Sequence, residues 1–388
     1  MGEHKINELF EKALGRVRKD LCKRNPLYIA GEKVFSDEEV ETVSPIDRRI
    51  VLGYFQKAKA EHACEAVEAA REAFYSAWRD IEWKGRVKIF KKASSVLRKR
   101  KFEVAAILSL ENGKTRNESI GEVDEAIDFL TLYCSMIEKN NGLIIERGPY
   151  ISQTETATFG YHGARSSGER IKIISKPYGV WSVIAPFNFP ISISTGMCSA
   201  ALITGNTVVF KPSFGDNPTP LTGLEIYNVF VEAGLPKGVF NYITGSGSEV
   251  GNELVTNPHV SGIAFTGSHE VGMNILRKAV SFNIPKQVVA EMGSKNPVVV
   301  SDSADVNMAV RGVVSAAFGF AGQKCSACSR AFIHSRVCSR FLERLVKEVK
   351  ALRIGNPLEK QVYSGPLIGK TALERYLFSV EKAKKEGR

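Results

Sequence analysis

The sequence predicts an α/β protein with a parallel β-sheet, and three observations lead to this prediction. The chain has 388 residues, 44% hydrophobic and 24% charged, so it can bury a large core and form two or three domains. From Gly179 onward, short apolar runs alternate with segments of helix length, as in βαβ units around a parallel sheet. Before that point the hydrophobic pattern is mostly helical.

The N-terminal part, from Ile6 to about Tyr150, has helical periodicity with one extended stretch from Leu27 to Ile50. Amphipathic helical spacing covers Glu61–Trp78 and Lys84–Asn112. Between about Ile151 and Pro177 the sequence is rich in Thr, Ser, Gly and β-branched residues. We expect a protruding β-ribbon there.

Six short apolar runs in the second half are predicted strands: Val180–Ala185, Thr207–Phe210, Val239–Ile243, Gly262–Phe265, Val288–Ala290 and Pro297–Ser301. Ligands of parallel sheets bind beyond the carboxyl ends of the strands. The residues that follow these runs are therefore the candidates for a functional site.

Composition and charge narrow the possible classes of protein. The net charge of +11 favours anionic partners. The densest basic run, Lys84–Lys101, has the spacing of an amphipathic helix and lacks nucleic-acid-binding signatures, so we expect a solvated helix face and no nucleic-acid partner. No apolar stretch approaches the roughly 20 residues of a membrane span, and Met1–Phe10 lacks a signal-peptide core. Seven scattered cysteines indicate reduced thiols and a cytoplasmic location.

Two strand ends carry side chains suited to a site. The first predicted strand is followed by the rigid turn 186–190, which contains Asn188, although Asn is also an ordinary turn residue. Lys211 follows the second strand, where its ammonium group can reach hydroxyls or phosphates of a nucleotide. A surface lysine is the alternative interpretation.

Two glycine-rich turns, 245–251 and 265–272, each lie between a predicted strand and a predicted helix. Free backbone N–H groups at a helix start can bind a pyrophosphate. Neither turn has the complete dinucleotide fingerprint, so each can also be a simple tight turn.

Glu291 ends an apolar run, where carboxylates are rare. A partly buried carboxylate there would suit general-base catalysis, whereas a helix cap or an ion pair is the alternative.

Cys325 follows a segment of small residues and precedes further small residues compatible with a helix, with Lys324 beside it, a setting that favours the thiolate. Cys328 completes a CxxC pair, which in other proteins binds zinc or exchanges disulfides. Since no second CxxC, nearby His pair or thioredoxin-like context exists in the sequence, we expect no metal site and interpret Cys328 as a packing residue.

Taken in order, these segments resemble the aldehyde dehydrogenase superfamily from about Tyr28 to the end of the chain. The motifs that carry the resemblance are residues 186–188 (PFN), 205–212 (GNTVVFKP), 265–268 (FTGS), 291–293 (EMG) and 322–325 (GQKC). Within this superfamily, residues 235–241, 245–251 and 319–330 are most similar to the Δ1-pyrroline-5-carboxylate dehydrogenases, which oxidise glutamate γ-semialdehyde to glutamate.

The resemblance implies a Rossmann-type dinucleotide-binding domain from residues 1–150 and 179–292. It also implies an oligomerisation β-ribbon at 151–178 and an α/β catalytic domain at 293–388. The expected partners are a small acidic aldehyde and, where the C-terminal part of the family fold is present, a second copy of the chain in a dimer-based homo-oligomer. Neither nucleic acid nor a membrane is expected as a partner.

The resemblance also implies a role for each matched residue. Cys325 attacks the aldehyde, Asn188 and the Cys325 backbone N–H hold the oxyanion, and Glu291 activates the hydrolytic water. The expected cofactor is NAD or NADP, with contacts from Lys211, Ser213, Gly267, Ser268, Pro186, Phe187 and Gly293. The expected substrate contacts are Ser326 and Phe189.

The sequence departs from the family pattern at several places. Phe214 and Ser213 leave the choice between NAD and NADP open, and Ser294 replaces the second glycine of a Gly-Gly-Lys turn. The chain ends at Arg388, before the family's Glu-x-Phe-Gly-Pro segment, so an incomplete catalytic domain is expected. Three alternatives stay open: an inactive dinucleotide-binding remnant, thiol-ester hydrolysis by Cys325 and Glu291 without a cofactor, and nucleic-acid binding.

Overall fold

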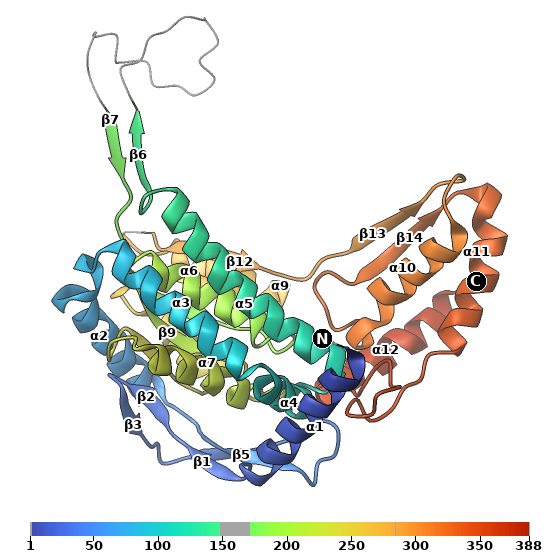
Figure 1. Ribbon diagram of the computed structural model, residues 1–388, viewed down its shortest axis with the longest axis horizontal. Helices are drawn as coiled ribbons and strands as arrows, with labels where there is room; N and C mark the ends of the chain where they lie inside the picture. The colour runs from blue at the N-terminus through green and yellow to red at the C-terminus, as the bar shows by residue number, and fades with distance from the viewer. Residues whose placement is uncertain (1, 148–170, 284, 388) are drawn as a thin grey trace, which may run out of the picture.

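A seven-stranded sheet forms the centre of the molecule, in the order β12-β11-β8-β9-β10-β2-β3 (Figure 1). The computed structural model describes residues 2–147, 171–283 and 285–387. Neighbours from β12 to β10 pair in parallel, whereas β10–β2 and β2–β3 are antiparallel. The predicted α/β class with a parallel sheet is confirmed.

The parallel strands match the predicted apolar runs closely. They are β8 (Val180–Ile184), β9 (Thr207–Lys211), β10 (Phe240–Tyr242), β11 (Val260–Thr266) and β12 (Gln287–Glu291). Between them lie α6 (Ser192–Ile203), α7 (Pro220–Ala233), α8 (Asn252–Thr256) with the π-helical turn Gly247–Gly251, and α9 (His269–Ala279). Every residue of β9 is buried, as expected for a strand covered on both faces.

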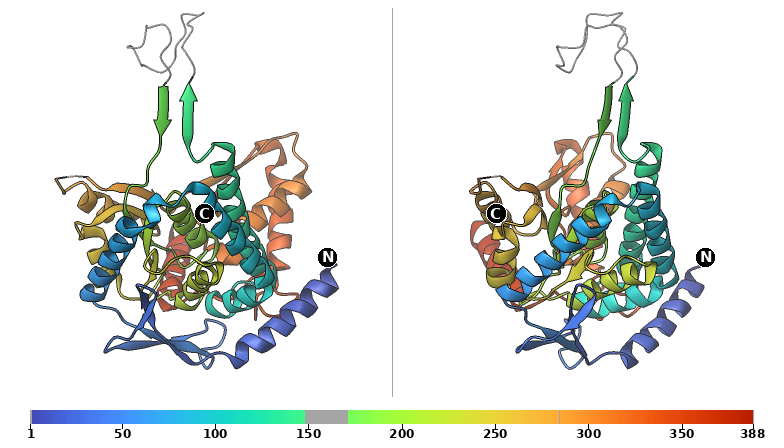
Figure 2. Two further views of the ribbon diagram at one scale, coloured as in Figure 1. Left: turned by 60° about the vertical axis from the view of Figure 1, so that its left-hand side comes forward. Right: turned by 90° about the vertical axis from the view of Figure 1, so that its left-hand side faces the viewer.

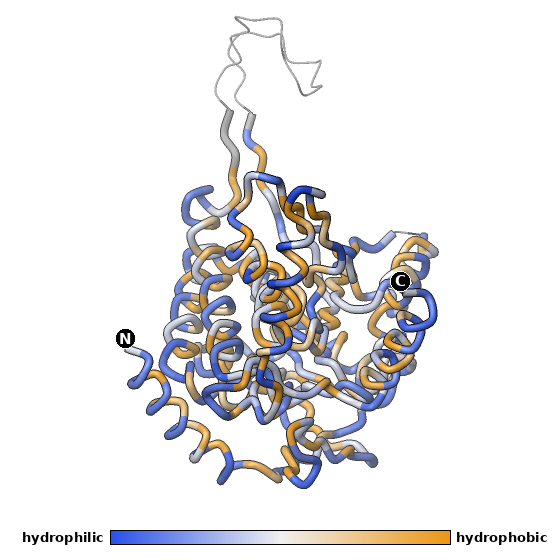
Figure 3. Tube along the Cα trace, turned by 90° about the vertical axis from the view of Figure 1, so that its right-hand side faces the viewer, coloured by the Kyte–Doolittle hydropathy of each residue, from blue (hydrophilic) through white to orange (hydrophobic). Residues whose placement is uncertain are grey.

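The N-terminal part adds helices and two small strand groups. After α1 (Glu3–Lys19), the strands β1 (Lys23–Asn25), β4 (Glu39–Val43) and β5 (Val51–Gln56) form a separate three-stranded sheet. The hairpin of β2 (Leu27–Ile29) and β3 (Glu32–Val34) extends the central sheet. Figure 3 shows α1 alternating between hydrophilic and hydrophobic positions, and its apolar side buries Phe10, Ala13, Leu14 and Val17.

The long amphipathic segments form α2 (Ala60–Ser76), α3 (Trp83–Lys99), α4 (Lys101–Asn112) and α5 (Arg116–Lys139), with a short 3₁₀ turn at Trp78–Asp80. The predicted stretch Lys84–Asn112 is two helices because the chain turns at Arg100. The basic run is amphipathic as predicted, since α3 buries Val87, Phe90, Val96 and Leu97.

Helices cover both faces of the central sheet and create two hydrophobic cores. One core joins α1 and α3–α7 to sheet residues such as Val183 and Phe210. The other joins α2, α8 and α9 to the opposite face, at residues such as Val209 and Ile263. The ends of the sheet, where the loops lie, are thereby left as the accessible part.

A two-stranded antiparallel ribbon projects from the body (Figures 1 and 2). Its described strands are β6 (Ile144–Arg147) and β7 (Ile171–Ile174). β6 thus begins ahead of the predicted boundary at residue 151. Most of the predicted ribbon, residues 151–170, lies outside the described residues.

The last part of the chain forms a lobe beside the central sheet (Figure 1). It contains β13 (Asn296–Val300) and β14 (Cys328–Ile333), which pair in parallel, with α10 (Val306–Phe318), the 3₁₀ turn Gly319–Gly322, α11 (Ser335–Lys350) and α12 (Lys370–Glu386). A third core between these two strands, α10 and α11 includes Val300, Val310 and Phe341. Within the described ranges, no helix is long and apolar enough to cross a membrane.

Candidate functional site

The carboxyl ends of four parallel strands place the predicted site residues along one edge of the sheet. Ile184 at the end of β8 is in register with Lys211 of β9 and with Phe265 of β11. Thr266 of β11 is in register with Glu291 of β12. Asn188, Lys211, Gly267 and Glu291 therefore lie on or just after the same edge, as the βαβ pattern predicts.

Cys325 lies in a tight turn in front of β14, and it is exposed. The backbone N–H of Ala327 donates to the carbonyl of Lys324 at 3.2 Å across this turn. The Asn296 amide donates to the carbonyls of Cys325, at 2.7 Å, and Ala327, at 3.3 Å. The expectation that helix-forming residues follow Cys325 is wrong, because Cys328 begins a strand that pairs with β13.

The backbone just before this turn has an unusual conformation. Phe320, with a φ of 50°, and Ala321, with a φ of 54°, are both left-handed, and Gly322 follows with a φ of 73°. Non-glycine residues in this region cost on the order of 1–3 kcal/mol each and persist only where the surroundings hold them. The ring of Phe320 is fully buried, which provides that restraint.

Asn188 contacts the Cys325 segment directly. Its Nδ2 donates to the carbonyl oxygen of Gln323 at 3.0 Å, so the β8 loop touches the residues in front of Cys325. One N–H of this amide remains for a further acceptor. The Oδ1 atom of Asn188 is buried and has no hydrogen-bond partner among the described residues.

Lys324 does not lie free beside the thiol. Its Nζ atom is 3.6 Å from a carboxylate oxygen of Glu118 on α5. Glu118 thus partly compensates the positive charge of Lys324, which is the charge next to Cys325 in the sequence.

Glu291 is exposed at the end of the edge strand β12, so the condition of partial burial, under which the sequence suggested general-base chemistry, is not met. An edge strand is covered on one side only, which accounts for the exposure. The backbone carbonyl of Glu291 accepts from the N–H of Gly267 at 3.1 Å. In the described part of the chain, no hydrogen bond or ion pair joins its side chain to the Cys325 turn.

Lys211 is buried, so the surface interpretation of this residue is wrong. Burial lowers the pKa of its ammonium group to about 8. Its one hydrogen-bond acceptor among the described residues is the carbonyl of Pro212, at 3.4 Å. A buried cation with a single long hydrogen bond retains donors for a ligand.

Ser213 follows two residues later, and its hydroxyl donates to the carbonyl of Asn217 at 2.7 Å. The proton of this hydroxyl is therefore already used within the loop.

The two glycine-rich turns have different surroundings. Ser268 caps α9, where its Oγ accepts from the N–H of Val271 at 3.3 Å, and the start of this helix is exposed. The other turn packs against the start of α2, since Glu249 accepts from the N–H of Ala60 at 3.4 Å. The start of α9 can therefore present backbone N–H groups to an anion.

The remaining predicted contacts lie near these loops. Pro186 is buried, and the Phe187 carbonyl accepts from the Asn112 amide at 2.6 Å. Ser326 is exposed beside Cys325, and Gly293 is exposed after β12. Phe189 is partly buried, with its ring against Lys114.

Sequence reasoning missed the segment 111–122, which connects α4 to α5 behind the site. Its polar side chains are largely buried: Glu111, Asn112, Lys114, Thr115, Arg116, Ser119 and Glu122. Glu111 accepts two backbone N–H groups at the start of α7. Arg116 donates to the carbonyl of Leu358 at 2.6 Å. The sequence did contain a signal for this segment, because several charged residues follow directly after an apolar helix. Charged side chains in such a place can be buried only if they pair with one another.

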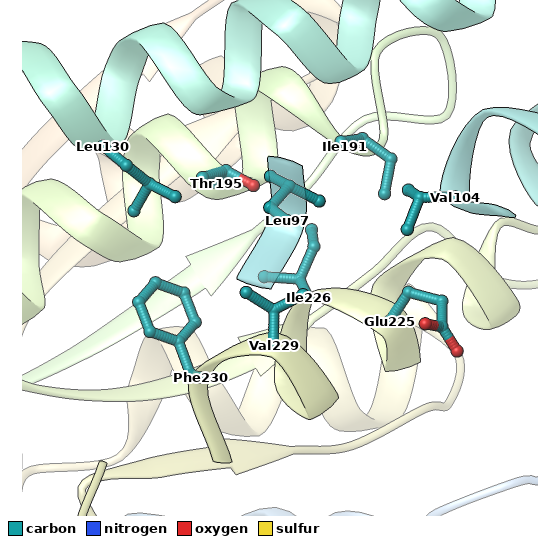
Figure 4. A pocket seen from close by; sticks show the side chains of 9 residues that line it. All are labelled: Leu97, Val104, Leu130, Ile191, Thr195, Glu225, Ile226, Val229 and Phe230. Carbon is teal, nitrogen blue, oxygen red and sulfur yellow. The ribbon is translucent and has the colours of Figure 1, made fainter. Parts of the chain in front are cut away.

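The fold also contains an internal void, which is distinct from the site. It measures about 10 Å³ and lies among apolar side chains of α3–α7, with Thr195 and Glu225 at its border (Figure 4). This is room for about one water molecule. In the described residues, no group of three or more His, Cys, Asp or Glu side chains is placed to hold a metal ion.

Comparison with known proteins identifies the family. A model of the aldehyde dehydrogenase family matches residues 33–388. A 1-pyrroline-5-carboxylate dehydrogenase of Geobacillus sp. (strain WCH70) is 39% identical over 384 residues, which is 98% of this chain and 70% of the relative.

Two solved structures have the same fold. The 1-pyrroline-5-carboxylate dehydrogenase from Thermus with bound NAD has a TM-score of 0.87 and 34% identity, over 99% of this chain and 71% of that one. An NADP-dependent enzyme of E. coli has a TM-score of 0.83 and 31% identity, over 94% and 71%.

Proposed function

Because this chain belongs to the aldehyde dehydrogenase family, we propose that it oxidises an aldehyde to a carboxylate through a thioester on Cys325. The observation that carries the proposal is the contact between Asn188 and Gln323, which brings an amide donor to the turn with the exposed thiol. Segments 137 positions apart in the sequence thereby form one site.

Side chains of the protein carry out the formation of the thioester. The Cys325 thiolate adds to the aldehyde carbon and forms a C–S bond. The free N–H of Asn188 and the backbone N–H of Cys325 stabilise the resulting oxyanion. After hydride is lost from the same carbon, the product is a thioester.

Hydrolysis regenerates the thiol. Glu291 accepts a proton from water as the water attacks the thioester, and the C–S bond breaks to release the carboxylate. Glu291 lies on the edge strand next to β11, and its side chain is exposed to solvent.

A nicotinamide dinucleotide, when bound, supplies the hydride acceptor. The strand ends fit such a group. Lys211 retains donors for ribose hydroxyls, and the exposed start of α9 at Gly267 and Ser268 offers N–H groups to a pyrophosphate. Pro186, Phe187, Ser213 and Gly293 lie on the same edge loops. We propose NAD as the preferred form, because the Ser213 proton is already donated to Asn217 and is not available to a 2′-phosphate.

For the substrate we propose a small acidic aldehyde, L-glutamate γ-semialdehyde. The curated relative and the Thermus structure are both named 1-pyrroline-5-carboxylate dehydrogenases. Ser326 is exposed next to the nucleophile, where its hydroxyl can bind a carboxylate, and Phe189 lines the neighbouring loop. We also propose a division into domains. Residues 1–150 and 179–292 form the cofactor domain, residues 151–178 an oligomerisation ribbon and residues 293–388 the catalytic domain.

The decisive test compares two cysteines three positions apart. Cys325→Ser is expected to abolish aldehyde-dependent NADH formation, because an alkoxide is hard to generate and a thioester cannot form. Cys328→Ser, at the start of β14, serves as the matched control and is expected to stay within about threefold of the wild-type rate, since a partly buried packing residue changes little. Undiminished turnover in Cys325→Ser contradicts the proposal, and so does dinucleotide binding by the wild type without any turnover.

A further inference from the structure

A buried ion pair lies behind two loops of the site, the Asn188 loop (residues 185–192) and the Cys325 loop (residues 319–327). Lys114 precedes α5, Glu122 lies within α5, and Lys114 Nζ donates to Glu122 Oε2. Both side chains are fully buried. Neither residue belongs to the catalytic steps proposed above.

The lysine contacts both loops through aromatic rings. Its Nζ lies 3.6 Å from the ring centroid of Phe189, the residue after Asn188. It lies 4.8 Å from the ring centroid of Phe320, in the left-handed segment before Cys325. A desolvated ammonium group attracts ring faces, so one cation draws the two loops together.

The glutamate fixes the far end of the same loop. Its Oε1 accepts from the N–H groups of Ile191, at 2.8 Å, and Ser192, at 3.2 Å, where α6 begins. A carboxylate at a helix start satisfies donors that otherwise lack partners. The turn from Asn188 to α6 is thus held at both ends by the pair.

Stability alone is a poor reason for such an arrangement. Apolar replacements of a buried ion pair are often neutral or stabilising, because removing two charges from water is costly. Burial lowers the pKa of Lys114 and raises the pKa of Glu122, which is the mark of that cost. Glu118 and Lys324, the other charged groups nearby, form their own bridge at 3.6 Å.

We infer that Lys114 and Glu122 are positioning residues for the proposed aldehyde oxidation. Through Phe189, Phe320 and the start of α6, they fix the Asn188 amide relative to the Cys325 turn and keep the strained backbone of Phe320 and Ala321 in place. The inference rests on the proposed function for its kinetic consequences, but the restraint on the two loops is independent of catalysis.

The experiment uses the full chain and four variants. Lys114→Met removes the charge and keeps the length of the side chain, whereas Lys114→Arg keeps the charge. The double variant Lys114→Met/Glu122→Gln leaves no unpaired buried charge and retains an acceptor for α6. Lys101→Met is the control for loss of a paired lysine, since Lys101 also pairs with a carboxylate, Asp124 at 2.5 Å, and also lies near a ring, Phe102 at 5.9 Å. This pair is partly exposed, and among the described residues Lys101 makes no hydrogen bond or ring contact with either loop.

Two readouts are required. In the double variant we expect kcat to fall about tenfold or more while the KM for the aldehyde changes less than about threefold, as for misplaced catalytic groups. Lys114→Arg is expected to recover part of kcat. Hydrogen exchange without substrate is expected to become faster in both loops, 185–192 and 319–327, with Lys101→Met unchanged.

The outcomes distinguish the positioning role of the ion pair from the proposed aldehyde oxidation. A double variant with wild-type kcat and wild-type exchange in both loops overturns the positioning role. Faster exchange in both loops supports it even if the wild type oxidises no aldehyde, a result that overturns the proposed function alone. Equal loss of kcat in Lys101→Met would also overturn it, because the effect would not be specific to the pair behind the site.

Discussion

Lys211 shows how burial changes the chemistry of a single residue. In the unfolded chain its ammonium group is solvated, whereas in the fold it is buried at the end of β9 and its pKa is lowered to about 8. The positive charge is therefore present below about pH 8 and is lost above it. A ligand that depends on this charge must bind less tightly in the alkaline range.

The first prediction follows from this titration. The Kd of NAD, measured by calorimetry from pH 6.5 to 9.5, is expected to rise as the pH passes about 8. Lys211→Met is expected to bind more weakly at pH 7, by about tenfold for one lost charged hydrogen bond, and to lose the alkaline rise. Parallel pH curves for the two proteins would show that Lys211 does not contact the dinucleotide.

At the scale of elements, buried carboxylates hold the starts of helices around the site. Glu111, at the end of α4, accepts from the N–H of Leu221 at 2.7 Å and from the N–H of Thr222 at 2.8 Å, at the start of α7. Complete burial raises its pKa from 4.5 to about 7, against the effect of these hydrogen bonds. In the folded protein Glu111 therefore keeps its proton up to a higher pH than in the unfolded chain.

This retention predicts a pH dependence of stability. Between about pH 4.5 and pH 7 the folded state binds more protons at Glu111 than the unfolded state, so the free energy of unfolding falls as the pH rises. The stabilisation is fully present below about 4.5 and is lost as the pH passes about 7. The change is on the order of 3 kcal/mol.

Urea unfolding of wild type and Glu111→Gln at several pH values measures this effect. The difference in unfolding free energy between them is expected to change across this window in favour of the variant, because glutamine does not titrate. Glu103→Gln, on the same helix but partly exposed, controls for loss of a charge. A constant difference between wild type and Glu111→Gln would mean that the burial of Glu111 has no thermodynamic consequence.

At the scale of the whole molecule, α12 presents apolar side chains to solvent. Leu373, Tyr376, Leu377 and Phe378 are all exposed, Phe378 by 71%, and no residue of this helix is buried. Exposed apolar patches mark surfaces that bind other proteins. We propose that these side chains form one contact of the homo-oligomer that the family resemblance implies.

Sedimentation velocity at increasing concentration tests this contact. The wild type is expected to associate, whereas Leu377→Ser/Phe378→Ser is expected to shift toward monomer with a melting temperature within about 2 °C, since surface changes alter stability little. Ser379→Ala changes the side of α12 that faces away from Leu377 and Phe378, and it is expected to sediment as the wild type does. Identical association in the double serine variant excludes α12 as the contact.

The sequence determined the class of fold and the order of the site motifs. Alternation of apolar runs located β8–β12 to within about two residues, because burial on both faces requires continuous apolar strands. The same pattern placed Asn188, Lys211, Gly267 and Glu291 at one sheet edge. These inferences depend on local periodicity, which a single sequence carries.

Only the tertiary structure decided which groups lie behind that edge and how exposed each residue is. The break at Arg100, the burial of Lys211, the exposure of Glu291 and the strand after Cys325 all depend on packing between distant segments. The Lys114–Glu122 pair is the strongest example, since spacing alone cannot tell a solvated charge from a buried one. The reason is physical: the free energy of a charge depends on its surroundings, which form only when the chain has folded.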